Sequence, residues 1–392
     1  MGAPVVAVVG GGQLARMMSQ AATSLGVRLR VLVEASDGST GLVVVDAPVG
    51  AASDESAVLD LVDGADVLTF EHEHVPPAIL AAVGARGVPV RPGADALVHA
   101  QDKLVMRRRL TELGLPVPAW APVRDLDELE AFLAASGGEA VVKTARGGYD
   151  GKGVRVVDDA HEAADWLAAA ADGTGPALLA EEKVPFSREL AVLVARRPSG
   201  ELMTWPVVES VQRDGVCEQV IAPAPELHPA TAAQAVAVAR AIAEGLQVVG
   251  VLAVELFEVP AGPGEPPTVL VNELAMRPHN CGHWTIDGSL TSQFEQHLRA
   301  VLDLPLGATT PRAPCTVMVN VLGSELTDLT DALPAVLTDP GVKVHLYGKQ
   351  VRPGRKLGHV TVCGDDLDAV RARALAAAAL LRGEAAAPGG AR

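Results

Sequence analysis

The chain has 392 residues, a formal net charge of −16, and a composition that is 49% hydrophobic but only 3% aromatic. This length allows two or three separately buried cores, and the acidic balance argues against a general nucleic-acid or anionic-membrane surface. The four cysteines form no CxxC pair, which favours reduced thiols. The longest apolar run, near 374–381, is too short to span a bilayer, and no cleavable signal is evident, so we expect a cytoplasmic location.

The first hundred residues predict a doubly wound, Rossmann-like α/β domain. Residues 5–9 form a continuous apolar run, typical of a buried parallel strand, and a glycine turn and a helix over 14–25 follow. Further strands are expected over 28–33 and 66–70. This βαβ order predicts a domain over residues 1–100.

The glycine turn after the first strand allows more than one ligand. Gly10, Gly12 and Ala15 satisfy the GxGxxA form, and Glu34 lies close to where a ribose-binding acid would sit, so a nicotinamide or flavin enzyme is one alternative. The same turn at a helix N-terminus suits any phosphate or small polar ligand.

The Glu-His-Glu-His string at 71–74 follows the strand that ends at residue 70, at the sheet edge where such folds bind ligands. Its composition suggests zinc, but alternate side chains of an extended segment point to opposite faces, so at most one pair can converge. A substrate contact from Glu73 is the stronger interpretation, and a solvated loop is the ordinary one.

Residues 101–186 predict a small α+β unit that could move as a lid. At its centre a strand ends in Lys143, and a loop with four glycines between 147 and 153 follows. Glycine lets backbone N–H groups approach phosphate oxygens, and Lys143 adds a point charge. Lys103 lies in the first turn of a helix, where the dipole disfavours lysine, so a second phosphate contact is one interpretation and a solvated side chain is the other. A flexible hairpin tip is the alternative.

Two apolar strands, expected over 251–257 and 268–273, carry Glu255 and Glu273. The loop between them would let the strands pair antiparallel. Because a lone buried carboxylate is costly, two on neighbouring strands are better explained by a shared cation. Mg²⁺ (or Mn²⁺) takes carboxylate and phosphate oxygens together. Acids in water at the strand ends are the alternative.

The C-terminal part predicts strands over 315–322 and 342–347, with a basic string at 349–356 in their connection. Its positive charges predict a phosphate pocket, because each charge-assisted hydrogen bond to phosphate contributes about 1.5–3 kcal/mol. A solvated turn is the alternative. The tail over 383–392, rich in alanine, glycine and proline, is expected to be disordered.

The lysines, the glycine loop and the two acidic strands together resemble the ATP-grasp superfamily. The resemblance implies that the lid and a body over 187–382 clamp ATP, with adenine along 181–184, ribose on Glu189, and the metal on Glu255 and Glu273. The ATP-binding residues that it implies are Lys103, Lys143, Gly148, Tyr149, Asp150, Gly151, Lys152, Gly153, Val154, Glu181, Glu182, Lys183, Val184, Glu189, Asn272 and Glu273.

The dense polar string at 274–285 narrows this resemblance. Together with 11–17, 147–151 and 345–359, it closely resembles the N5-carboxyaminoimidazole ribonucleotide synthetases of purine biosynthesis, in the family's order from about residue 5 to residue 360. Three positions depart from the pattern: Met276 replaces the usual proline, Cys281 the usual serine, and Val211 a histidine of some relatives. The resemblance implies a homodimer that uses ATP and bicarbonate to carboxylate aminoimidazole ribonucleotide through carboxyphosphate.

The resemblance also implies roles for single residues. Arg277 would orient bicarbonate, and His279 and Asp150 are candidates for proton transfer. The ribonucleotide would contact Gln13, Leu14, Glu73, Tyr149, Asp150, Arg155, Lys349, Arg355 and Lys356. The alternatives are a formate-dependent glycinamide ribonucleotide transformylase, a biotin carboxylase, and a non-catalytic nucleotide-binding regulator.

Overall fold

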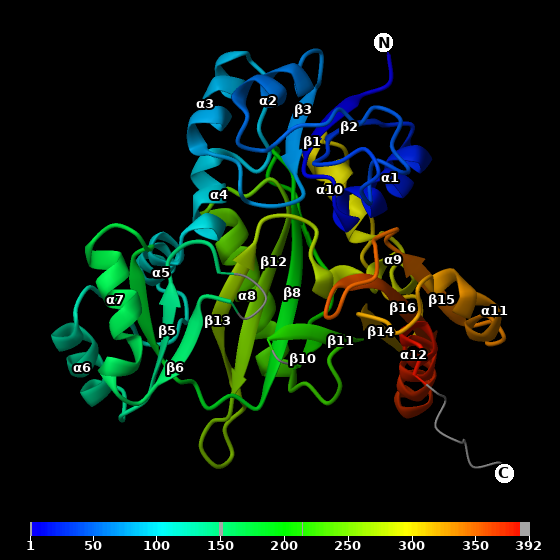
Figure 1. Ribbon diagram of the computed structural model, residues 1–392. Helices are drawn as coiled ribbons and strands as arrows, with labels where there is room; N and C mark the ends of the chain where they lie inside the picture. Colours follow the sequence, from blue (N-terminus) through cyan, green and yellow to red (C-terminus); the bar gives the residue numbers. More distant parts are fainter. Residues whose placement is uncertain (1, 149–151, 214, 385–392) are drawn as a thin grey trace.

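The computed structural model describes residues 2–148, 152–213 and 215–384. These residues form three sheets, which lie within residues 1–100, 101–186 and 187–382 (Figure 1). The predicted domain boundaries stay predictions. No helix in the described part of the chain is both long and apolar enough to cross a membrane.

The N-terminal sheet is parallel, with the buried β1 at its centre. Its strands are β1 (Val5–Val9), β2 (Arg28–Leu32) and β3 (Val67–Phe70). Its helices are α1 (Gln13–Leu25), α2 (Glu55–Leu61), α3 (Pro77–Ala85) and α4 (Ala94–Gln101). The apolar run of β1 is buried on both faces because helices cover the sheet, which confirms the expected doubly wound opening.

The lid contains an antiparallel sheet in the order β4–β7–β5–β6. Its strands are β4 (Trp120–Val123), β5 (Ala140–Thr144), β6 (Val154–Val157) and β7 (Leu178–Glu182). Its helices are α5 (Lys103–Glu112), α6 (Leu126–Ala135), a 3₁₀ turn η1 (Ala160–Ala163) and α7 (Ala164–Ala171). The strand β4 was not expected, because a proline interrupts its short apolar pattern.

The body is built on a nine-stranded sheet in the order β13–β12–β8–β10–β11–β14–β16–β15, with β9 paired to β8. The strands are β8 (Arg188–Arg196), β9 (Leu202–Thr204), β10 (Val208–Arg213), β11 (Val216–Ala222), β12 (Gly250–Val259), β13 (Thr268–Ala275), β14 (Cys315–Leu322), β15 (Val342–Leu346) and β16 (Lys356–Gly364). The predicted metal strands thus pair antiparallel as β12 and β13.

Helices cover both faces of the body sheet (Figure 1). They are α8 (Pro229–Gly245), η2 (Asn280–Gly282), α9 (Thr285–Gly288), α10 (Gln293–Val301), η3 (Leu329–Ala332), α11 (Leu333–Val336) and α12 (Leu367–Arg382). Helix α10 packs against both α1 and β12, so it joins the N-terminal domain to the body.

The basic string does not lie where the sequence suggested. It connects β15 to β16, rather than linking the strand that begins at residue 315 to the one that begins at residue 342. The strand β16 had not been expected, because glycine and histidine break its apolar run. Of the tail predicted to be disordered, residues 385–392 lie outside the described residues.

Candidate functional site

Lys143, at the end of β5, is held by two side chains. Its Nζ lies 2.7 Å from Glu181 Oε2 and 3.3 Å from Asn272 Oδ1. Glu181 lies on β7 of the lid, whereas Asn272 lies on β13 of the body. The ammonium group is therefore placed where the two parts of the chain meet.

Arg107 of α5 makes contacts at this junction that the sequence did not reveal. It is fully buried, and its Nε lies 2.6 Å from Glu181 Oε1. Two other nitrogens donate to the carbonyl oxygens of Val271 and Asn272, at 3.0 and 2.8 Å. A planar guanidinium can satisfy three acceptors at once, so Arg107 ties the lid strand β7 to the metal strand β13.

Glu181 is ionised at this junction. Burial alone would raise its pKa, but the positive charges of Arg107 and Lys143 lower the pKa to about 2. Both carboxylate oxygens of Glu181 are occupied by these cations, and the backbone of Glu181 and Glu182 lies between β4 and β5 in the lid sheet. Of the neighbouring side chains, Glu182 accepts from the Ala119 amide, and Lys183 pairs with Glu139.

Glu255 and Glu273 are direct partners in the register of β12 and β13, so their side chains share one face of the sheet. Glu189 lies on the neighbouring strand β8, diagonal to Glu255 and on the same face. Burial and the negative charges of Glu273 and Glu189 raise the pKa of Glu255 to about 8. Burial, partly opposed by Lys143, also raises the pKa of Glu189 to about 7. Like-charged carboxylates crowded in this way favour a cation between them.

A magnesium ion fits this pair of carboxylates. Mg²⁺ is usually held by one or two carboxylates and by substrate phosphates, and Lys103 Nζ lies 3.1 Å from Glu273 Oε1 on the side where phosphate is expected. The described residues contain no cluster of three or more His, Cys, Asp or Glu side chains that could hold a metal alone. The zinc interpretation of 71–74 therefore gains no support.

His279 and Arg277 follow β13 directly and face acids from different parts of the fold. Arg277 Nε lies 3.0 Å from Glu73 Oε2 of the N-terminal domain, and His279 Nε2 lies 3.5 Å from Glu255 Oε1. Burial, assisted by the charges of Arg277 and Lys356, lowers the pKa of His279 to about 3, so its imidazole is neutral.

The tautomer of His279 follows from its neighbours. The Cys281 backbone N–H lies 3.4 Å from His279 Nδ1, and the Cys281 thiol is 3.2 Å from the same nitrogen. A backbone N–H can only donate, so Nδ1 accepts and the proton resides on Nε2, facing Glu255. The Cys281 thiol makes a polar contact with Nδ1.

The basic string meets the start of α1. Lys349 Nζ donates to Gln13 Oε1 and lies 5.7 Å from the centre of the Tyr347 ring. Burial, reinforced by the charges of Arg355 and Lys356 and opposed by Glu71, lowers the pKa of Lys349 to about 8. The Arg355 guanidinium donates to the Gln350 carbonyl at 3.2 Å.

Glu71 is a second residue whose place the sequence did not reveal. Its buried carboxylate accepts hydrogen bonds from the backbone N–H groups of Gly12 and Leu14, at the N-terminus of α1. Burial raises its pKa despite these bonds. Leu14, predicted to contact substrate, has its amide bound to Glu71 and its side chain in the core.

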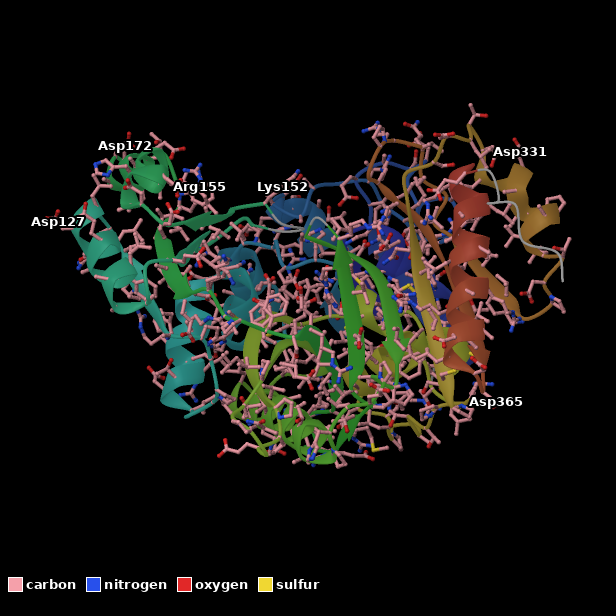
Figure 2. All side chains as sticks on the ribbon, turned by 90° about the horizontal axis from the view of Figure 1, so that it is seen from below. Asp127, Lys152, Arg155, Asp172, Asp331 and Asp365 are labelled. Atoms are coloured by element: carbon pink, nitrogen blue, oxygen red, sulfur yellow. The ribbon has the colours of Figure 1, made fainter. Side chains whose placement is uncertain are left out.

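Arg155 is not brought to the basic string. Its guanidinium pairs with Asp165 at 2.6 Å and lies 4.3 Å from the centre of the Trp166 ring. Figure 2 shows Arg155 in the lid, on the side of Asp172. A movement of the lid would be needed to bring it to a ligand bound at Lys349.

The glycine loop closes tightly at two glycines. A Cβ at Gly148 would lie 2.6 Å from the Lys152 carbonyl oxygen, and Gly153 has a φ of +70° and abuts Thr144. Larger residues would strain or block these positions. Val154 follows at the start of β6. The other predicted contacts of this loop, Tyr149, Asp150 and Gly151, lie outside the described residues.

Models of known protein families match consecutive parts of the chain. A ribonucleotide synthetase preATP-grasp domain matches residues 4–101, an ATP-grasp domain matches 108–294, and the phosphoribosylaminoimidazole carboxylase C-terminal domain matches 316–373.

Two similar bacterial proteins are both described as N5-carboxyaminoimidazole ribonucleotide synthases. An N5-carboxyaminoimidazole ribonucleotide synthase from Mycobacterium tuberculosis is 52% identical over 387 residues, which cover 96% of this chain and 87% of the relative. The enzyme of that name from Corynebacterium ammoniagenes is 50% identical, with 97% and 92% covered.

Solved structures extend the similarity to the fold. The N5-carboxyaminoimidazole ribonucleotide synthetase of Thermus thermophilus superposes with a TM-score of 0.84 at 39% identity, covering 98% of this chain and 99% of that one. The N5-carboxyaminoimidazole synthase of Aspergillus clavatus, solved with ADP and 5-aminoimidazole ribonucleotide, superposes with a TM-score of 0.85 at 30% identity, covering 97% and 98%.

Proposed function

Because this chain belongs to the N5-carboxyaminoimidazole ribonucleotide synthase family, we propose that the residues around Glu255, Arg277 and Lys349 carry out the family's reaction. The chain is an ATP-grasp ligase that converts aminoimidazole ribonucleotide to its N5-carboxy derivative with ATP, in purine biosynthesis. Membership of this family argues against the two alternative functions, a dinucleotide-dependent oxidoreductase and a non-catalytic regulator.

In the proposed complex, ATP lies between the lid and the body. Lys103, Lys143 and the N–H groups of the loop at 147–153 face the phosphates, the backbone of 181–184 faces adenine, and Glu189 faces the ribose. The position of Lys143 between lid and body supports this arrangement, because its charge is held at 2.7 Å from Glu181 and 3.3 Å from Asn272. A fixed cation stabilises transferring phosphoryl groups without reorganisation.

Glu255 and Glu273 would hold Mg²⁺ (or Mn²⁺) together with phosphate oxygens. Bound there, the ion would offset negative charge on the transferring phosphoryl group. The raised pKa of Glu255 supports the assignment, because a nearby cation would offset the burial and the carboxylate repulsion that raise it. Lys103, now paired with Glu273, would be free to turn to phosphate once the carboxylate binds the ion.

The proposed chemistry activates bicarbonate, which is a poor electrophile. A bicarbonate oxygen attacks the γ-phosphorus of ATP, the bond to ADP breaks, and carboxyphosphate forms. Carboxyphosphate then cleaves to CO₂ and phosphate. The exocyclic amine of the ribonucleotide adds to CO₂ and loses a proton, giving the carbamate.

Arg277 would orient bicarbonate and stabilise carboxyphosphate, because its guanidinium matches a planar carboxylate. Its contact with Glu73 holds it towards the N-terminal domain. His279 is neutral, with its proton on Nε2, so it is suited to donate a hydrogen bond beside Glu255. Asp150, which lies outside the described residues, remains the proposed second group for proton transfer. Lid closure would keep water from carboxyphosphate.

The ribonucleotide phosphate would bind to Lys349, Arg355 and Lys356, with Gln13 and Glu73 beside the rest of the ligand. The observation that carries the proposal is a pair of contacts from the segment after β13: Arg277–Glu73 joins it to the N-terminal domain, and His279–Glu255 joins it to β12. Tyr149, Asp150 and Arg155 would join from the lid on closure, and Leu14 would help through the shape of the α1 turn.

The test is ADP release with each pair of substrates. Bicarbonate with aminoimidazole ribonucleotide should drive ADP release, whereas formate with glycinamide ribonucleotide should not. The opposite preference would contradict the proposal and favour the transformylase. We also propose a homodimer, from family resemblance, which sedimentation velocity tests, and a cytoplasmic location, from the sequence features described above.

A further inference from the structure

Helix α10 carries two buried glutamines that each bind a backbone segment through a pair of reciprocal hydrogen bonds. Gln293 Oε1 accepts from the His279 N–H at 2.8 Å, and its Nε2 donates to the His279 carbonyl at 2.7 Å. Gln296 does the same at Gly307, with distances of 2.7 and 2.8 Å. Both glutamine side chains are fully buried.

The hydrogen bonds from Gln293 to His279 take the place of those that a neighbouring strand would make. Strand β13 ends at Ala275, and His279 still has extended backbone angles, φ −127° and ψ 159°. Its N–H and carbonyl would need partners if buried. The Gln293 amide pairs with both groups, as a neighbouring strand would, and the carbonyl also accepts from the Gly282 N–H at 3.0 Å. Because the N–H is bound by Gln293, this amide sets the position and orientation of the His279 backbone.

Gln293 is itself held rigidly. Its backbone N–H donates to Thr285 Oγ1 at 2.8 Å, and its Nε2 lies 3.0 Å from His283 Nδ1. A Cβ on Gly282 would clash with the Gln293 side chain, so the backbone at Gly282 packs directly against the Gln293 amide. The orientation of the amide is settled because the His279 N–H can face only an acceptor.

We infer that Gln293 is a positioning residue for the carboxylation step. By holding the backbone of His279, it keeps His279 Nε2 at 3.5 Å from Glu255 Oε1 and His279 Nδ1 beside Cys281. This inference rests on the proposed role of His279.

The role predicts a selective loss. Gln293 holds none of the proposed adenine or phosphate contacts, so ATP binding should survive its replacement, whereas turnover should fall. A displacement of a catalytic group by about 1 Å can reduce the rate by about a hundredfold. Replacement of Gln296, which makes a similar pair of hydrogen bonds from the same helix, should not lower turnover.

The experiment compares Gln293→Met with Gln296→Met. Both variants keep a side chain of similar length and lose a reciprocal pair of buried hydrogen bonds, and Gln293→Met also loses the contact with His283 Nδ1, so it should lower the unfolding temperature at least as much as Gln296→Met. We expect Gln293→Met to lower ribonucleotide-dependent kcat by about tenfold to a hundredfold, with the KM for ATP unchanged. Gln296→Met should keep the kcat of the unaltered enzyme.

Two further variants complete the test. Gln293→Asn, which keeps the amide but shortens its reach, provides a second replacement should the methionine variant fail to fold. It should show the same selective fall in kcat. His279→Ala should lose turnover, and adding Gln293→Met to it should cause no further loss, because the glutamine acts through the histidine.

The contrary results are distinct. Folded Gln293 variants with the kcat of Gln296→Met would overturn the inference alone, provided that His279→Ala is inactive. Losses that multiply in the double variant would also overturn it, because the glutamine would then act by another route. A fully active His279→Ala would overturn the proposed role of His279, and the inference with it.

Discussion

Arg107 Nε lies 2.6 Å from Glu181 Oε1, in a buried ion pair that joins α5 to the last strand of the lid sheet. The same guanidinium binds two carbonyls of β13, so one side chain links the strand that holds Lys143 in place to the strand that carries Glu273. Such a buried ion pair fixes the relative positions of its elements but adds little net stability, because the cost of desolvating the two charges offsets much of their attraction. Its removal, however, would leave a buried charge short of a partner.

We therefore expect Arg107→Met to lower the free energy of unfolding by about 3 kcal/mol, measured by urea denaturation. Arg109→Met on the same helix is the matched control. Arg109 pairs with Glu112 at the surface, so its loss should cost less than about 1 kcal/mol. Equal effects of the two changes would contradict the structural role of Arg107.

Glu273→Ala should abolish ATP turnover, with a loss on the order of a thousandfold or more in kcat. The change removes one of the two proposed metal ligands and the partner of Lys103. The assay is ribonucleotide-dependent ADP release. Glu265→Ala, in the exposed loop between the same two strands, is the control and should be fully active. Normal ADP release by Glu273→Ala would remove the metal assignment.

Arg355→Ala should mainly raise the KM for the ribonucleotide, by about tenfold to a hundredfold, because a charge-assisted hydrogen bond to phosphate contributes about 1.5–3 kcal/mol. The kcat should change little. Arg371→Ala, on the exposed side of α12, removes the same charge elsewhere and should leave this KM unaltered. An unchanged KM in Arg355→Ala would show that the phosphate binds elsewhere.

The pH dependence of ribonucleotide binding should reflect Lys349, whose pKa burial lowers to about 8. Lys349 is charged below that pH and loses its proton above it, so the KM for the ribonucleotide should rise as the pH passes through 8. Arginine stays charged throughout this range, so in Lys349→Arg the rise should disappear. Steady-state kinetics from about pH 6.5 to 9.5 measures this, and identical profiles for the two proteins would refute it.

The sequence predicted well those features that depend on neighbouring residues. Continuous apolar runs marked the buried strands, and an acid inside each of two such runs marked Glu255 and Glu273 as a pair, which the register of β12 and β13 bears out as a structural relationship. Motif resemblance gave the ATP-grasp fold and the family. These signals are local, because period and composition are set over a few residues.

Features that depend on distant partners were missed. Arg107 looks like any charged helical residue, yet its partners lie 74, 164 and 165 residues away. Glu71 stands beside Glu73 in one polar string, and nothing local shows that one carboxylate caps α1 while the other binds Arg277. Gln293 left only a faint signal, a polar residue on the face of α10 that turns to the core.

The most direct test of the proposed chemistry follows an oxygen atom from bicarbonate. With ¹⁸O-labelled bicarbonate, ATP and aminoimidazole ribonucleotide, attack on the γ-phosphorus places a bicarbonate oxygen in the phosphate released. Mass spectrometry of phosphate from a short incubation should therefore find ¹⁸O in it, in proportion to the carbamate formed. Phosphate that carries no label, while product accumulates, would contradict carboxyphosphate and with it the central claim for this site.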